Sequence, residues 1–195
     1  MITLRRPSRE ALHAFRSGQA ALDFTYPAVG ATAGTPPHGY VVDRTRVKLG
    51  DGGGVFRAAR AALERWEHFR LGWAEAGPTE TPIKAGEVVA VVARVLGLWW
   101  ANACRIVYAV DEAGSVTRFG FAYGTLPDHA ESGEERFLVE WDRATDAVHY
   151  DILAFSRPRH PLARLGYPLA RRTQKRFSRD SAAAMREAVS LTPVS

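Results

Sequence analysis

The sequence predicts an α+β protein in which a curved antiparallel sheet of about six strands wraps on a long carboxy-terminal helix, with a shorter helix after the first strand. Short apolar or alternating segments, separated by turn residues, follow one another from Glu87 to Phe155. A stretch with an apolar stripe at helical spacing comes after them, from His160 onwards. One face of such a sheet must be covered, and the last helix is the only element long enough to cross it. This order indicates a helix-grip fold, in which sheet and helix enclose a cavity.

Composition favours one ordinary globular domain. Of the 195 residues, 46% are hydrophobic and 24% are charged, which is enough to bury a sizeable core. We expect a single domain over residues 1–195. Its four parts are an irregular segment at 1–39, a strand and helix at 40–73, an antiparallel sheet at 83–156 and the carboxy-terminal helix at 160–189.

Cysteine content and the lengths of apolar runs narrow the class of protein. Cys104 is the only cysteine, so a disulfide within the chain and a four-cysteine zinc site are excluded, and its apolar neighbours predict a buried small side chain. The longest apolar run, GEVVAVVARVLGLWWANAC, is interrupted and falls short of the ~20 residues of a membrane helix. The amino terminus lacks the hydrophobic core of a secretory signal. We therefore expect a cytoplasmic protein without a transmembrane segment.

The arginine-rich start, MITLRRPSREALHAF, fits either a transit peptide or a short helix. The helix is favoured, because Ser8 can cap its start and Gly18 can end it. Leu12 and Phe15 would then share its inward face. The next segment, Thr25–Tyr40, is rich in Gly, Pro and Thr and is predicted to be irregular.

Alternation predicts the first strand in YVVDRTRVKLG, with Val47 and Leu49 on one face and basic residues on the other. The glycine cluster GDGGG then leads into a helix, whose apolar spacing continues to Gly72. Glycines at a helix start can let backbone N–H groups contact a phosphate, but this spacing matches no phosphate-binding motif. A flexible strand-to-helix turn is the favoured interpretation.

Five further strands are predicted, joined by short turn-like segments such as DEAGS and RATD. Their expected bounds are Glu87–Val95, Cys104–Asp111, Val116–Gly124, Glu135–Asp142 and Ala147–Phe155. The final helix carries an apolar stripe that includes Leu169 and Phe177. Since a proline breaks helical hydrogen bonding, a break or kink is expected near Gly166–Pro168.

Four stretches carry a resemblance to a known family: FTYPAVGAT, GFAYGTLPDHAESGEERF, ILAFSRP and RLGYPLARRTQKRFSRDSAAAM. Over roughly Phe24 to Met185 the chain resembles the bacterial and plant family called domain of unknown function nineteen-ninety. That family has no established reaction, so the resemblance implies no catalytic residues. It implies a relation to the START-like and birch-pollen-allergen-like helix-grip proteins. These commonly bind apolar small molecules, and some catalyse cyclisation or dehydration in the cavity, although likeness of fold is weak evidence of function.

Eight residues are candidate ligand contacts, because a pocket needs apolar surface with a few hydrogen-bonding groups. They are Tyr108, Phe119, Phe121, Tyr123, His129, Phe137, Trp141 and Tyr150. The alternative is that the aromatic rings among them simply fill the core. In strand 116–124 the aromatic side chains share one face, and Gly120 and Gly124 indicate bends or close backbone approach. Tyr123 is the favoured contact, because it lies at the end of the strand.

The acidic segment GTLPDHAESGEE is predicted to be a hairpin loop. It contains side chains of the types that metal ions bind, at Asp128, His129, Glu131, Glu134 and Glu135. His129 is also suited to proton transfer near neutral pH. However, Glu134 and Glu135 are adjacent, so in an extended chain they point to opposite faces. A solvated acidic loop is favoured, and no metal or cofactor is predicted.

His149 and Asp151 share one face of the last predicted strand. They could form a catalytic dyad. Pairing with neighbouring strands on the solvent face is favoured, because opposite charges commonly pair across strands.

The carboxy-terminal segment is strongly basic. Between Arg157 and Val189 there are eight arginines and one lysine against Asp180 and Glu187. Nucleic acid or an anionic membrane surface could use that charge, but no nucleic-acid-binding motif accompanies it. A solvated helix face is favoured, and nucleic acid is disfavoured as a partner.

Three functions follow as hypotheses. The favoured one is a module that binds an apolar or amphipathic small molecule in its cavity. The second is a cofactor-independent enzyme of the same fold that uses His129 or a cavity tyrosine as acid or base. The third is an accessory protein that binds nucleic acid or another anion through the basic helix. A titratable group facing a cavity would favour the second, and a filled core with a continuous basic stripe would favour the third. The sequence leaves the oligomeric state open.

Overall fold

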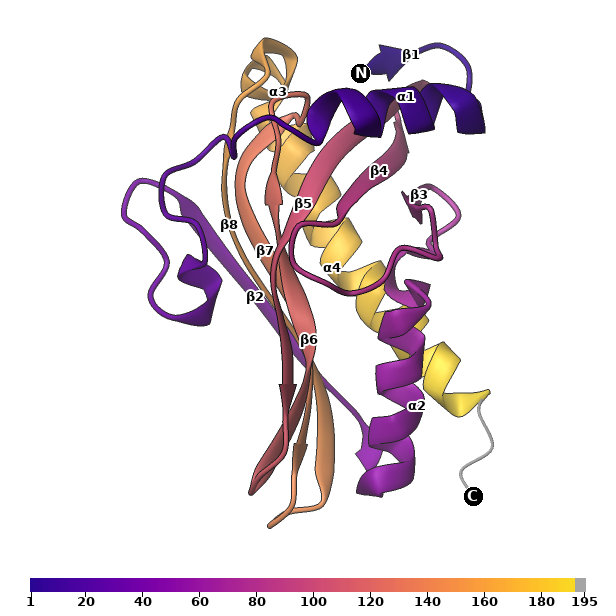
Figure 1. The fold of residues 1–195 in the computed structure, drawn as a ribbon, viewed down its shortest axis with the longest axis vertical. Coiled ribbons are helices and arrows are strands. Elements are labelled where there is room, and N and C mark those ends of the chain that lie inside the picture. The colour runs from indigo at the N-terminus through magenta and orange to yellow at the C-terminus, as the bar shows by residue number, and fades with distance from the viewer. Residues whose placement is uncertain (192–195) are drawn as a thin grey trace.

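The computed structural model describes residues 1–191, and its main element is a strongly curved antiparallel sheet (Figure 1). Seven strands follow the order β2-β8-β7-β6-β5-β4-β3, and the short β1 pairs with β5. The strand bounds are β1 Ile2–Thr3, β2 Val41–Asp51, β3 Ala74–Gly77, β4 Val88–Val95, β5 Leu98–Glu112, β6 Val116–Thr125, β7 Glu131–Asp142 and β8 Ala147–Pro158. The helix-grip prediction is confirmed, but the sheet has more than the six strands expected. The pattern misses β1 and β3, because two and four residues are too few for alternation to be visible.

The helices are α1 Arg9–Gln19, α2 Gly52–Glu64, α3 Pro161–Leu165 and α4 Tyr167–Ser190, with 3₁₀ turns η1 Ala31–Ala33 and η2 Glu67–Phe69. Ser8 caps α1 as expected, since its Oγ accepts a hydrogen bond from the N–H of Ala11 at 3.2 Å. The expected break before α4 falls at Gly166, and Pro168 lies in the first turn, where no helical hydrogen bond is lost. None of the helices within residues 1–191 is long and apolar enough to cross a membrane.

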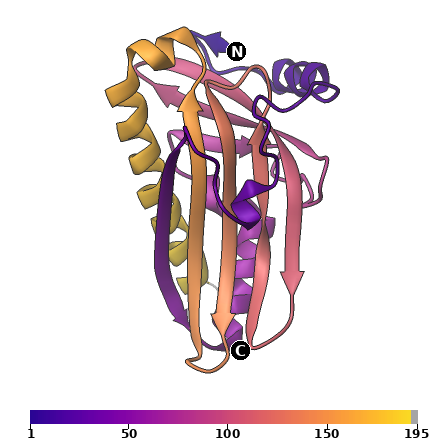
Figure 2. The same cartoon turned by 90° about the vertical axis from the view of Figure 1, so that its left-hand side faces the viewer.

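The sheet separates two layers of different character. Helices α2 and α4 lie on its concave side, and α4 runs diagonally across the strands (Figure 1). The amino-terminal segment, residues 20–40 between α1 and β2, contains η1 and lies on the convex side, in front of the strands in Figure 2. The long strands β5 to β8 thus have one face toward the helices and one toward this segment.

The last three glycines of the cluster GDGGG form the first turn of α2, where a separate turn between strand and helix was predicted. Strand β2 ends at Asp51 and α2 begins directly at Gly52. A Cβ atom at Gly53 would lie 2.8 Å from the ring of Trp141 on β7, so the glycine lets the helix pack on that ring. The helix also ends earlier than predicted, because Trp66 adopts a left-handed conformation with φ of 58°.

The hairpin between β6 and β7 is tighter than predicted. Strand β7 already begins at Glu131, so the turn spans only 126–130, and the expected long loop is wrong. Gly120 permits this close pairing, and Gly133 permits the equally close pairing of β7 with β8. A Cβ atom at Gly120 would overlap the carbonyl oxygen of Phe137, and one at Gly133 would overlap that of Phe155.

One buried carboxylate, that of Glu134, holds the amino-terminal segment against the convex face. Its Oε2 accepts hydrogen bonds from the hydroxyl of Tyr26 and the N–H of Gly30, both at 2.7 Å. Its Oε1 accepts from the N–H of Thr32 at 2.9 Å and from the hydroxyl of the same residue. Glu134 is only 2% exposed, so the expectation of a solvated acidic loop is wrong at this residue.

The core between the sheet and α2 is aromatic and contains one histidine. The ring centroid of Phe137 lies 4.7 Å from that of His68 and 5.3 Å from that of Phe121. His68 is completely buried, and neither of its ring nitrogens has a hydrogen-bond partner among residues 1–191. Burial therefore lowers the pKa of His68 from 6.5 to about 3.

The free energy of unfolding is expected to decrease at acidic pH, in part because of His68. Below pH 6.5 the unfolded chain binds a proton at this residue that the folded chain refuses until about pH 3, so stability falls as the pH falls through this interval. One proton is worth ~1.4 kcal/mol per pH unit, so between pH 6.5 and 4 wild type should lose roughly 3 kcal/mol more than His68→Leu. Urea unfolding at several pH values measures this difference.

The exposed His13 on α1 supplies the control, since His13→Leu should leave the acid dependence of the wild type unchanged. Parallel pH profiles for wild type and His68→Leu would contradict the assignment.

Candidate functional site

A pocket of about 180 Å³ lies between the concave face of the sheet and α4. It exists because the inward-facing side chains become small toward one end of β8. Tyr150 and Ile152 fill the core, whereas Ala154 and Ser156 border the pocket. Gly133 lies opposite Ser156 on β7 and adds no side chain. The sheet therefore leaves a space that α4 covers.

Aromatic side chains form much of the apolar wall of this pocket. Phe69 follows α2, Trp73 precedes β3 and Phe177 projects from α4. The ring centroids of Phe69 and Phe177 lie 5.0 Å apart. The indole N–H of Trp73 donates to Asp180 at 3.0 Å, so this ring is tied to α4.

Opposite the helix, four neighbouring strands contribute one row of residues to the pocket. The register pairs Asp43 with Ala154, Ala154 with Glu135, and Glu135 with Tyr123. The hydroxyl of Tyr123 donates to Oε2 of Glu135 at 2.8 Å. The small Ala154 thus leaves open space between two carboxylates.

Glu135 has a pKa near neutral pH. Burial raises its pKa from 4.5 to about 7, the hydrogen bond from Tyr123 opposes the rise, and the charge of Asp43 adds to it. The side chain is partly accessible because it borders the pocket. A carboxyl group of this kind can both donate and accept a proton near neutral pH.

The other carboxylates at the pocket differ in their partners. Asp43 receives two hydrogen bonds of 2.6 Å from the guanidinium of Arg171 on α4, which links β2 to the helix. Burial raises the pKa of Glu131, and the charge of Arg171 and a hydrogen bond with Ser156 oppose that rise.

His129 borders the same pocket but makes no hydrogen bond to a carboxylate of residues 1–191. Its Nδ1 accepts a hydrogen bond from the N–H of Glu131 at 2.9 Å, which leaves the proton of the neutral ring on Nε2. Burial lowers the pKa of His129 to about 4, so the ring is neutral at pH 7. Within the described chain, no three or more His, Cys, Asp or Glu side chains are grouped so as to hold a metal ion.

Of the eight candidate contacts, only Tyr123 and His129 border this pocket. Those that fill the core or pack beneath α2 instead are Phe119, Phe121, Phe137, Trp141 and Tyr150. They do share the concave face, but α2 and η2 cover that part of the sheet. Tyr108 lies on the convex face, where its hydroxyl is 2.8 Å from that of Thr32, because a bulge between Ile106 and Tyr108 shifts the register.

The sequence analysis placed Glu135 at the start of a strand and among possible metal ligands, but it did not predict that this side chain faces the pocket. Its position two residues before the apolar Phe137 was the available signal, because residues i and i+2 of a strand share a face. A second signal was the change from large to small inward-facing residues along 148–156. Asp43 could have been found in the same way, because it shares the face of Val47 and Leu49 on β2.

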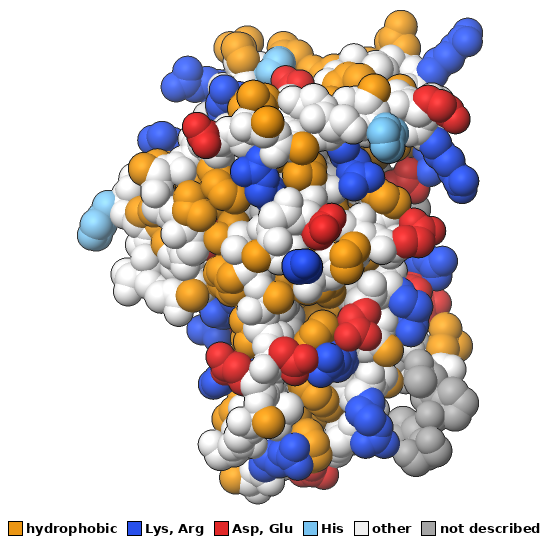
Figure 3. Space-filling model, in the orientation of Figure 1, with side chains coloured by type: hydrophobic (Ala, Val, Ile, Leu, Met, Phe, Trp, Pro, Cys, Tyr) orange, Lys and Arg blue, Asp and Glu red, His pale blue; other side chains and the backbone are white. Residues whose placement is uncertain are grey.

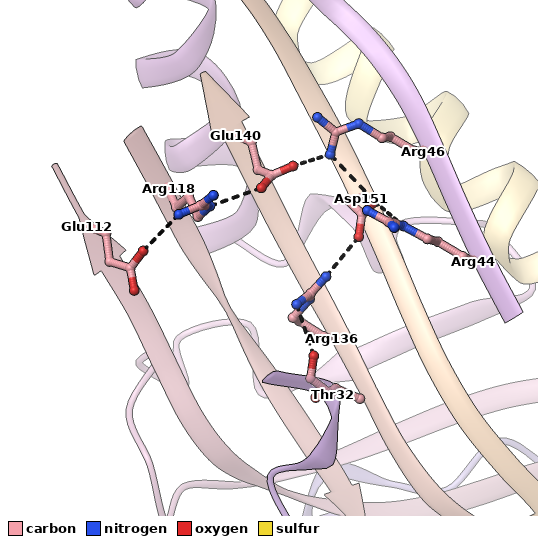
Figure 4. Close-up of polar contacts among 8 residues, drawn as sticks. All are labelled: Thr32, Arg44, Arg46, Glu112, Arg118, Arg136, Glu140 and Asp151. Carbon is pink, nitrogen blue, oxygen red and sulfur yellow. Dashed lines mark hydrogen bonds and ion pairs between the residues drawn. The ribbon is translucent and has the colours of Figure 1, made fainter. Parts of the chain in front are cut away.

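The convex face carries a network of charges that spans the strands β5, β6, β7, β8 and β2 (Figure 4). Arg118 bonds Glu140 at 3.0 Å and Glu112 at 3.3 Å. Asp151 on β8 is fully buried beneath arginines, at 2.8 Å from Arg44 and 3.1 Å from Arg136. Asp151 therefore pairs across strands, as the sequence favours, and it does not bond His149. These charges stabilise the outer face and lie on the opposite side of the sheet from the pocket.

Several of the basic residues of α4 have acidic partners. Arg171 pairs with Asp43, and both Arg176 and Arg179 contact Asp180. On the face drawn in Figure 3, basic and acidic side chains are interspersed. Because of these ion pairs, we interpret the basic side of α4 as a solvated face.

The fold and its pocket define the class: a helix-grip protein. The structure resembles the crystal structure of Ara h 8.0201 with a TM-score of 0.51 and 12% identity, over 79% of this chain and 100% of that one. At this identity the likeness concerns the fold alone.

Residues 25–184 match the family model "Domain of unknown function (DUF1990)", and the chain belongs to this family. A UPF0548 protein from Dictyostelium discoideum is 43% identical over 157 residues, which cover 76% of this chain and 72% of that protein. A UPF0548 protein from Deinococcus radiodurans is 35% identical over 191 residues, which cover 92% and 94% of the two chains.

Proposed function

We propose that this protein binds a small, largely apolar molecule in the pocket between the sheet and α4. The observation that carries the proposal is the pocket itself, where small residues on β7 and β8 face the aromatic side chains of Phe69 and Phe177. A filled core would have had large side chains at Ala154 and Ser156. An engineered apolar cavity of about 150 Å³ accepts benzene, so a space of 180 Å³ suits a molecule with one ring and a short substituent.

Filling the pocket is expected to remove its ligand without unfolding the protein. Ala154→Leu places three more carbon atoms between Asp43 and Glu135, in space that is empty of protein atoms. Native mass spectrometry of protein purified from its own host should detect a retained small molecule in wild type and none in the variant. Ala109→Leu, at an exposed position of β5, is the matched control and should retain the molecule. Equal retention by the two variants would contradict binding in this pocket.

A second candidate function is acid–base catalysis in the same pocket. It is favoured by Glu135, whose pKa of about 7 and hydrogen bond to Tyr123 suit a group that moves a proton near neutral pH. The protein would then convert the bound molecule rather than only hold it. If so, Glu135→Gln should not convert the molecule even when the molecule is supplied at a concentration that saturates the pocket. Conversion at the wild-type rate in this variant would exclude Glu135 as the acid or base.

A further inference from the structure

The charged residues among those that line the pocket are all acidic. Carboxylate residues border it at Asp43, Glu131, Glu134 and Glu135, and no lysine or arginine of the described chain is among the lining residues. The carboxylate of Glu134 is turned away to the convex face, so three carboxylates remain on the pocket side. Arg171 satisfies only one of these directly, Asp43.

Glu135 is the carboxylate best placed to meet a ligand. It has no ion pair among residues 1–191, and its only described hydrogen bond comes from Tyr123 to Oε2. Its neighbours across the strands are Ala154, which is too small to cover it, and Tyr123. The other groups that interact with it electrostatically are Asp43, Cys104 and Tyr150, and none of these is a cation.

From this arrangement we infer that the ligand is a small amine, with an apolar body against Phe69 and Phe177 and a protonated amino group on Glu135. The inference rests on the proposed function and adds the charge of the ligand. An ammonium group supplies the missing cation and can donate to the free oxygen of Glu135. The aromatic side chains beside it suit an organic cation. A metal ion is a poorer complement, because no three ligand side chains within the described residues are grouped to hold one.

Three probe molecules of nearly equal shape and different charge test whether the pocket prefers a positively charged ligand. Binding of 2-phenylethylamine, 2-phenylethanol and phenylacetate to the full chain is measured by calorimetry at pH 8. The amine should bind at least tenfold more tightly than the alcohol, and phenylacetate should bind most weakly. Equal or tighter binding of the alcohol or of phenylacetate would overturn the inference.

Glu135→Gln keeps the shape of the side chain and removes its charge. It should weaken binding of the amine at least tenfold and change that of the alcohol less than twofold. Glu64→Gln, at an exposed position of α2, should change neither. Loss of alcohol binding in Glu135→Gln would mean that the substitution disturbs the pocket, and unchanged amine binding would overturn the inference.

The affinity for the amine should also rise roughly tenfold between pH 6 and pH 8, as Glu135 loses its proton. Burial raises the pKa values of Tyr123, Tyr150 and Cys104 and lowers that of His129 to about 4, so these groups do not titrate in this interval.

The two proposals fail in different ways. A molecule retained from the host that carries no amino group would leave the pocket function standing and overturn the choice of an amine. No retained molecule, together with no binding of any of the three probes, would overturn both.

Discussion

Glu134→Ala is expected to lower the free energy of unfolding by roughly 4 kcal/mol or more. The variant leaves the hydroxyl of Tyr26 and the N–H groups of Gly30 and Thr32 without their acceptor. Each buried donor left unsatisfied costs about 1–3 kcal/mol. A water molecule in the space that the side chain vacates would relieve part of this cost. Urea unfolding at pH 7 measures the loss.

Glu112→Ala is the control, because it also removes the carboxylate of a strand residue, but one that lies exposed and pairs with Arg118. Exposed ion pairs contribute at most about 1 kcal/mol. A loss below about 1.5 kcal/mol for Glu134→Ala would show that its four hydrogen bonds are not what holds the segment.

Phe137→Ala is expected to cost about 3–5 kcal/mol, the range for truncating a large buried aromatic side chain. Phe137 is completely buried and packs against His68, Phe69 and Phe121, so its removal leaves a cavity that its neighbours cannot easily close. Phe177→Ala on α4 is the comparison. Because Phe177 is partly exposed and already borders the pocket, its truncation creates less new empty volume and should cost clearly less.

The two truncations also report on the pocket. Unfolding by urea should separate them by at least ~1 kcal/mol, on the scale by which core substitutions vary with residual cavity volume. Losses of equal size would mean that the space beside Phe177 is in effect filled.

Much of the fold could be predicted because its main elements have strong periodicity. The alternation in β2 and β8, the apolar stripe of α4 and the break at Gly166 are all visible in the sequence. The prediction of β5 began six residues too late, since Trp99 and Trp100 belong to the strand and precede its clearest apolar run. Boundaries depend on hydrogen bonding with neighbours, which a single sequence does not contain.

The site was harder to predict than the fold, because a pocket forms where large side chains are absent. The prediction of the site relied on aromatic residues, yet the rings of Phe121 and Phe137 are completely buried in the core. The pocket lies where inward-facing positions hold Gly133, Ala154 and Ser156, and small residues give little signal alone. Nor could the sequence show that Glu135 on β7 lies opposite Ala154 on the neighbouring strand β8, because that depends on the register of the two strands.

Strand β7 therefore carries two adjacent carboxylates on opposite faces of the sheet. A change of one residue in the length of the strand would misplace one or both of them. Glu134 faces the amino-terminal segment and Glu135 faces the pocket, because consecutive side chains alternate across a strand. Inserting or deleting one residue between Gly133 and Phe137 would exchange the two sides for everything on one side of the change. Such an insertion or deletion keeps nearly all of the sequence, yet it moves a charged side chain to the face of the sheet that packs in the core. Variation in chain length should therefore be accommodated in turns such as 126–130 and 143–146 and be absent from this stretch of the strand.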